Sequence, residues 1–224
     1  MKNTIKIFSA IIYMAAILIS SLSFGQMKQE SKKTNSAVSA STLKTNMRKL
    51  WEDHVIWTRN VILCLVDELP GTDQAVKRLL QNQVDIGNAF KPYYGEEMGK
   101  KLTELLYVHI NTSAEVVKAA KAGNTAAFDE ANKRWYANSD EMSEFLCKAN
   151  ANWVLADMKM MMEDHLKITT DEANQRIKKD YDADILAFDK INNEILVMAD
   201  VFSEGIVKQF PEKFKIGGTK LASK

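Results

Sequence analysis

The sequence predicts an all-α fold, an up-and-down helical bundle built from three pseudo-repeated helical hairpins. Only three prolines occur in 224 residues, so long stretches contain no helix breaker. Apolar residues recur at helical spacing, and the alternating runs typical of strands do not occur. The three histidines, His54, His109 and His165, lie 55 and 56 residues apart. A period of this kind is typical of one supersecondary unit used three times.

The repeat extends beyond the histidines. Residues 77–82 resemble residues 133–138, and residues 175–180 offer a third copy, so these stretches end at Asn82, Asn138 and Asp180. Each stretch is followed by an aspartate, at Asp85, Asp140 and Asp184. The interval from histidine to stretch end is 28 and 29 residues in the first two copies but only 15 in the third. The third hairpin is therefore predicted to be shorter by about seven residues in each arm, or two helical turns.

The first half of the folded part is predicted to contain three helices. The first runs over about residues 42–69 and is ended by Pro70-Gly71. A shorter helix follows from Thr72 or Asp73 to Leu80, and residues 82–94 are predicted to hold a break and a short helical piece. A long helix then covers residues 96–122, before the turn at residues 123–125.

The second half is predicted to continue in the same way. A fourth helix reaches the asparagine-rich residues 149–152, where the chain is predicted to break. The fifth helix covers residues 153–167, and Thr169-x-x-Glu172 has the pattern of a capping box that starts a new short helix. The last long helix begins near Ala183 and stops before Pro211.

The two ends of the chain have compositions unlike the rest. Residues 1–25 combine a basic start, a short apolar run and small residues before Gln26, the pattern of a cleaved signal peptide, with an uncleaved signal anchor as the alternative. Residues 26–41 are predicted to be a disordered spacer, residues 42–214 the bundle domain and residues 215–224 a flexible tail. We expect an exported protein, periplasmic or secreted, whose mature chain has no stable membrane span.

Composition and motifs remove several classes of function. The formal net charge is +1 and no long basic run follows the signal, so nucleic acid and anionic membranes are unfavourable partners. The chain has no G-x-S-x-G elbow and no phosphate-binding glycine loop. The E-x-x-H pairs of di-iron bundles are absent in the required form. The sequence does not predict the oligomeric state.

The two cysteines, Cys64 and Cys147, are predicted to be free. Each lies late in its predicted helix, and the two helices should be antiparallel. Their levels along the bundle then differ by roughly 27 Å, at 1.5 Å per residue. A disulfide requires Cα atoms within about 7 Å. We therefore expect two buried thiols.

The three histidines are the candidate site. Each lies about 12 residues into its helix and on its apolar stripe, so they should point inward at one level. Such a set can bind zinc, copper or another metal, or a small ligand, and four methionines within residues 158–162 suggest either a soft metal or core filling. The candidate partners for the second ring nitrogens are the acids directly before two of the histidines, Glu52, Asp53, Glu163 and Asp164, and the repeated polar residues Asn82, Asn138, Asp180, Asp85, Asp140 and Asp184.

Two other interpretations of the histidines remain open. In the first, each ring bonds only the polar residue of its own hairpin, so the protein is structural or an interaction module. In the second, one histidine is the acid–base group of a hydrolase or isomerase. Neither requires a bound metal.

Four segments also resemble a known family. Residues 50–59 (LWEDHVIWTR), 91–95 (KPYYG), 134–138 (RWYAN) and 198–200 (MAD) are similar to an uncharacterised bacterial family of small helical proteins. The resemblance covers about residues 50–210. Some relatives carry the labels acetylglutamate kinase or glycosyltransferase, activities that imply strands and a phosphate loop, and the sequence contains neither. The family implies a helical fold and no particular active residues.

Overall fold

The computed structural model describes residues 39–214, which form six long helices and one short 3-10 helix. This part of the chain contains no strand, so the predicted all-α bundle is confirmed. The predicted signal peptide, nearly all of the spacer and the tail lie outside the described residues. None of the described helices is both long and apolar enough to cross a membrane.

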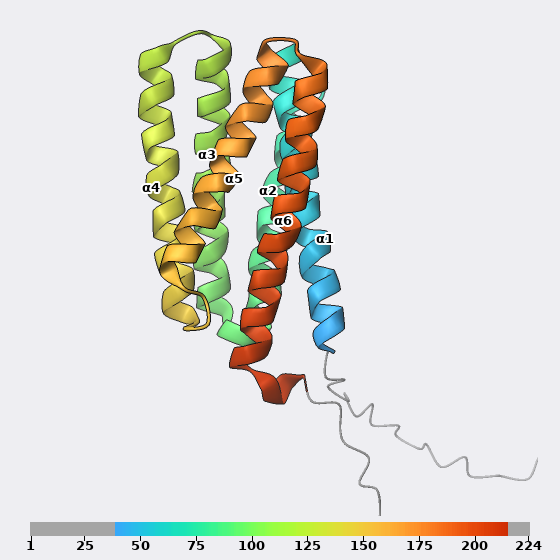
Figure 1. The fold of residues 1–224 in the computed structure, drawn as a ribbon, viewed down its shortest axis with the longest axis vertical. Helices are drawn as coiled ribbons and strands as arrows, with labels where there is room; N and C mark the ends of the chain where they lie inside the picture. Colours follow the sequence, from blue (N-terminus) through green and yellow to red (C-terminus); the bar gives the residue numbers. More distant parts are fainter. Residues whose placement is uncertain (1–38, 215–224) are drawn as a thin grey trace, which may run out of the picture. The chain divides into compact units, whose positions relative to one another are not determined.

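The six helices follow one another as three antiparallel hairpins. They are α1 (Ala40–Asp67) with α2 (Thr72–Tyr94), α3 (Glu96–Lys121) with α4 (Thr125–Ala149), and α5 (Leu155–Ile177) with α6 (Tyr181–Gln209). The turns within the hairpins lie together at one end of the bundle (Figure 1). The 3-10 helix Pro211–Lys213 follows α6 at the opposite end.

The odd-numbered helices lie inside and the even-numbered helices lie outside. Helices α1, α3 and α5 contact one another. Each outer helix packs against two inner ones: α2 on α1 and α3, α4 on α3 and α5, and α6 on α5 and α1. Any side chain that points inward from an odd-numbered helix therefore meets the other two odd helices. That the hairpins are copies of one unit stays a prediction.

Local signals set the helix ends. The side chains of Ser39, Asn124 and Asp180 each accept a hydrogen bond from the backbone N–H three residues later, at 3.0, 3.1 and 3.1 Å. Such N-caps satisfy one of the otherwise unpaired first N–H groups. At the α3–α4 turn, Gly123 has a φ of 63°, which glycine adopts without steric cost. Asp180 is thus a cap, and not the end of a histidine-partner stretch.

Two predicted helix breaks were wrong. Helix α2 runs without interruption from Thr72 to Tyr94, because its central polar residues are buried and bonded: Asn82 Nδ2 donates to the Leu50 carbonyl at 2.9 Å. Helix α5 likewise continues through the predicted capping box. Thr169 Oγ1 donates to the carbonyl of His165 at 2.8 Å, within the same helix. The third hairpin is not shortened either, since α5 and α6 contain 23 and 29 residues.

The largest apolar cluster fills the half of the bundle near the chain ends. Its fully buried members include Met47, Ile86, Phe90, Ile195 and Phe202. Smaller clusters fill the other half, near the hairpin turns. The histidines sit among these groups, in the interior of the bundle. Both cysteines are free, as predicted, but they are half-buried rather than fully buried.

Candidate functional site

The three histidines come together in the core. His54, His109 and His165 lie on α1, α3 and α5, and their exposed fractions are 2%, 3% and 4%. Their ring centroids are 5.8 Å apart for His54 and His165, 6.1 Å for His109 and His165, and 6.5 Å for His54 and His109. They form a layer because each occupies the inward face of an inner helix.

Each histidine faces a polar residue from the outer helix of its own hairpin. Gln83 Nε2 lies 3.3 Å from His54 Nδ1, and Glu194 Oε2 lies 2.9 Å from His165 Nδ1. In the second hairpin Asn138 raises the pKa of His109, against the larger lowering effect of burial. His109 Nδ1 and Asn138 Oδ1 are both buried without a hydrogen-bond partner, so this hairpin lacks the direct hydrogen bond of the other two.

The spacing between histidine and partner is constant. In all three hairpins the partner follows its histidine by 29 residues. Asn138 is the only one of the three that was predicted from the sequence. Gln83 and Glu194 were missed, although the constant interval was present in the sequence. Residues 175–180 resemble the other two stretches in sequence, but they lie at the turn between α5 and α6 and not at the level of the histidines.

The other predicted partners lie elsewhere. Asn82 bonds the backbone of α1, and Asp180 caps α6. Asp85 accepts a hydrogen bond from its neighbour on α2, and Asp140 is exposed and pairs with Lys159. Asp184 is buried but bonds arginines. None of these five side chains is hydrogen-bonded to a histidine in residues 39–214.

The rings surround a small cavity of about 20 Å³. Three methionines, Met142, Met162 and Met198, line it together with the histidines, and the remaining lining residues are aliphatic or aromatic. A cavity needs roughly 10–15 Å³ to hold a water molecule. The space therefore fits one water-sized species or one ion. It is too small for an organic ligand.

Burial keeps two of the rings neutral. It lowers the pKa of His54 to about 3, and the nearby His165 lowers it further in the same direction. Burial also lowers the pKa of His109 well below its ordinary value. A neutral imidazole has one ring nitrogen with a free lone pair, which is the form that binds a metal.

The hydrogen-bond partners assign the ring protons. Gln83 Nε2 also donates to the Leu79 carbonyl at 2.8 Å and to Asn82 Oδ1 at 3.2 Å, so this amide nitrogen faces His54 as a donor whose two hydrogens are shared among three acceptors. His54 Nδ1 then accepts, and its proton lies on Nε2. Glu194 can only accept from His165 Nδ1, so the neutral form of this ring has its lone pair on Nε2. Asn138 Nδ2 donates to Leu105, at 3.2 Å, which leaves its oxygen for His109. His109 and His165 thus have a lone pair on the ring nitrogen that points away from the partner, whereas His54 has an N–H there.

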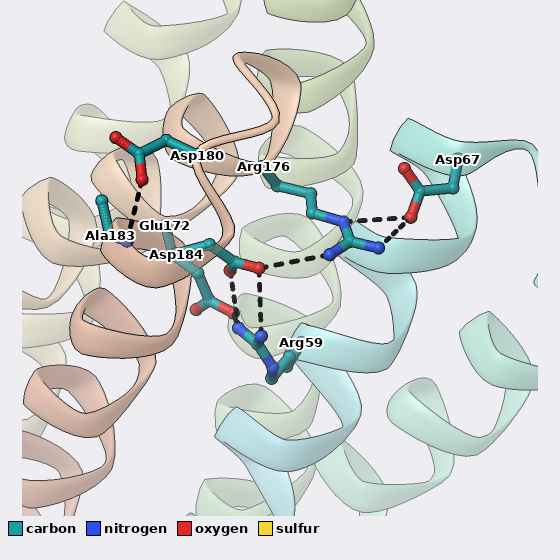
Figure 2. A network of polar contacts seen from close by, with 7 residues as sticks. All are labelled: Arg59, Asp67, Glu172, Arg176, Asp180, Ala183 and Asp184. Carbon is teal, nitrogen blue, oxygen red and sulfur yellow. Dashed lines mark hydrogen bonds and ion pairs between the residues drawn. The ribbon is translucent and has the colours of Figure 1, made fainter.

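A buried ion network lies beyond the histidines, closer to the hairpin turns. Arg59 on α1 donates to Glu172 Oε1 on α5 at 2.6 Å and to Asp184 Oδ1 on α6 at 2.8 Å (Figure 2). Arg176 donates to Asp184 at 3.4 Å and also pairs with Asp67 (Figure 2). Burial raises the pKa of Glu172 to about 7 against the opposing effect of Arg59. The carboxylates are engaged by arginines, so this cluster ties helices together.

In the arrangement described for residues 39–214, no group of three or more His, Cys, Asp or Glu side chains could hold a metal ion. A metal at the histidines would therefore need small ring movements or a ligand of another type. No protein-family profile, no curated protein and no solved structure matches the chain. The site's chemistry has to be inferred from its geometry.

Proposed function

We propose that this protein binds a single transition metal ion in the cavity between the three histidines. The observation that carries the proposal is the separation of the rings, 5.8 to 6.5 Å between centroids. Three imidazoles that bind one ion at about 2.0–2.1 Å in a tetrahedral arrangement have centroids roughly 5 Å apart. If each pair of rings moved about one ångström closer together, the three histidines would reach that geometry.

Three features of the surroundings support an ion over an organic ligand. The cavity volume of about 20 Å³ suits one ion and excludes an organic ligand. Glu194 holds the outer nitrogen of His165, which is how metal-binding histidines are usually oriented. The methionines add ligands that soft metals favour.

The chemistry does not favour an acid–base enzyme. A general base works best when its pKa lies near the operating pH. The pKa of His54 is lowered to about 3 and that of His109 is also low, because both rings are buried. Neither ring is therefore suited to exchange protons with a substrate near neutral pH.

A purely structural hydrogen-bond layer is the second candidate, and Gln83 favours it. Because Gln83 donates to His54, the Nε2–H of His54 can donate toward the cavity, where His109 and His165 have lone pairs. One water molecule would satisfy all three rings. Under this alternative the histidines fix the packing of the three hairpins and bind no metal.

The compartment is part of the proposal. We propose that the mature protein begins at Gln26 and acts outside the cytoplasm, on the strength of the signal-like residues 1–25. Mass spectrometry of the protein isolated from its cells tests this directly. Recovery of residues 1–25 on the mature chain would contradict it.

Metal content and metal-linked stability test the site. The protein is purified without a histidine tag, its metal content is measured, and thermal unfolding is followed with zinc or copper and with chelator. An ion that binds only the folded state raises the unfolding temperature. His109→Ala should abolish this rise. Leu106→Ala is the matched control, because Leu106 also lines the cavity and is equally buried but is no ligand.

A double-mutant cycle separates the two candidates. If the rings share one ion, His54→Ala and His109→Ala are strongly non-additive with metal present and approach additivity in chelator. If the rings form only a structural layer, the losses are the same with and without chelator. No bound metal and no stabilisation by any added ion would refute the proposed function.

A further inference from the structure

We propose that the ion is copper(I), held by the Nε2 atoms of His109 and His165 and by a methionine thioether, with His54 as a hydrogen-bond donor beside it. The inference rests on the proposed function, because it names the ion and ligands of the same cavity. Copper enters and stays as the monovalent ion, so no electron transfer takes part in binding.

The ring protons select two of the three histidines as ligands. Glu194 accepts the Nδ1 proton of His165. Asn138 Nδ2 donates to the Leu105 carbonyl, so its unpaired oxygen is the group available to accept a proton from the unpaired Nδ1 of His109. Both rings therefore have a lone pair on Nε2. His54 differs because the amide of Gln83 donates to its Nδ1. Its Nε2 therefore carries the proton. This nitrogen could bind a cation only if the proton moved to Nδ1 and the Gln83 amide rotated to accept it.

The methionines provide the remaining ligand. Met142, Met162 and Met198 come from α4, α5 and α6, are buried with exposed fractions of 1%, 5% and 1%, and all line the cavity. Each lies three or four residues along its helix from a histidine or a histidine partner. Met162 precedes His165 by three residues, and the other two follow Asn138 and Glu194 by four. Residues three or four apart share one face of a helix, so the thioethers lie beside the rings.

Ligand softness favours copper(I) over zinc(II). Thioether sulfur is a soft ligand that selects copper(I), whereas zinc sites use thiolate, imidazole and carboxylate. The cavity contains no thiolate, since neither Cys64 nor Cys147 lines it. A site with two imidazoles and a thioether also agrees with the absence, in residues 39–214, of a metal-binding group made of three His, Cys, Asp or Glu.

The charge balance of the core favours a monovalent ion. Glu194 is the carboxylate in hydrogen-bond contact with the histidine layer in the described chain. Glu172 on α5 is paired with Arg59. A copper(I) ion with neutral ligands leaves one positive charge, which the Glu194 carboxylate can balance. A divalent ion would leave a second buried charge unbalanced, which is strongly unfavourable in an apolar core.

The test is a comparison of metals and variants under anaerobic conditions. The full mature chain is titrated with copper(I), with silver(I) as a redox-inert soft analogue and with zinc(II), each in competition with a chromophoric chelator. The wild type should bind copper(I) and silver(I) at a 1:1 ratio and more tightly than zinc(II). The variant Met142→Leu/Met162→Leu/Met198→Leu should bind copper(I) at least about tenfold more weakly, a change of about 1.4 kcal/mol or more.

Matched controls separate ligand loss from changes in packing. Met158→Leu and Met47→Leu make the same substitution at buried positions that do not line the cavity, so they should keep wild-type copper affinity. Leucine replaces methionine with little change in volume, so all these variants should fold. His109→Gln and His165→Gln should lose copper binding, and His54→Gln should weaken it less than either.

The outcomes distinguish this inference from the proposed function. If zinc(II) binds as tightly as copper(I) and the triple leucine variant binds both like the wild type, the copper inference is wrong and the metal site stands. Equal losses for His54→Gln, His109→Gln and His165→Gln would also overturn the ligand assignment. If none of the three metals binds, both proposals fail.

Discussion

Arg59 joins three helices and is the best point at which to test how the third hairpin is held. Its guanidinium lies 2.6 Å from Glu172 and 2.8 and 3.1 Å from the two oxygens of Asp184. The exposed fractions of these carboxylate side chains are 2% and 1%. In the described chain Glu172 has no other side-chain partner. Replacing Arg59 by methionine keeps the apolar stem and removes the charge.

The expected loss is large. Removing one partner of a buried ion pair costs about 3–5 kcal/mol, because the carboxyls left in the core must either stay charged without compensation or take up a proton. Arg176 remains near Asp184 at 3.4 Å and relieves part of the effect. We therefore expect Arg59→Met to lower the free energy of unfolding by about 3 kcal/mol or more, against a total of about 5–15 kcal/mol for a typical domain.

Urea unfolding at pH 7 is the measurement, with Arg134→Met as the matched control. Arg134 also pairs with two acids, Glu115 and Glu130, but these side chains are 49%, 50% and 68% exposed. Exposed pairs contribute about 0–1 kcal/mol, so the control should change little. Arg59→Met/Glu172→Gln should recover part of the loss because it removes the unpaired carboxylate. Equal midpoints for Arg59→Met and Arg134→Met would refute the reasoning.

Three further predictions concern a titration, a close contact and the thiols. Burial lowers the pKa of His54 to about 3. The stabilisation that the neutral ring gives the folded state is therefore complete above pH 6.5, the ordinary histidine pKa, and is lost as the pH falls toward 3. Between pH 6.5 and 4.5 the wild type should lose about 2 kcal/mol more than His54→Gln in urea unfolding, and equal losses would contradict this. A Cβ on Gly205 would lie 2.0 Å from Trp153 Nε1, so Gly205→Ala should cost about 1–3 kcal/mol, whereas a wild-type midpoint would show that the ring can move. Cys64 and Cys147 should both be alkylated after unfolding without reductant, and a protein with no reactive thiol would contradict the fold.

The sequence determined the class of fold because helix formation is mainly local. Apolar spacing, caps and rare prolines act within a few residues of chain, so the helical class and the helices α1, α3, α4 and α6 could be predicted, whereas α2 and α5 were each predicted to break where the helix continues. The period of the histidines also predicted that His54, His109 and His165 would point inward at one level, since parallel inner helices bring equivalent positions to one level. Whether the three rings meet was left open by the sequence, and the structure places their centroids 5.8 to 6.5 Å apart.

The partners of buried polar groups were decided only by the tertiary structure. Asn82 and Thr169 looked like helix breaks because their polar side chains favour turns, yet each is hydrogen-bonded inside a continuous helix. Gln83 and Glu194 became visible as histidine partners only when the outer helices were placed against the inner ones. Rotation and height between helices depend on packing across the bundle. The same packing fixes which ring nitrogen carries the proton, and with it which histidines can bind a metal.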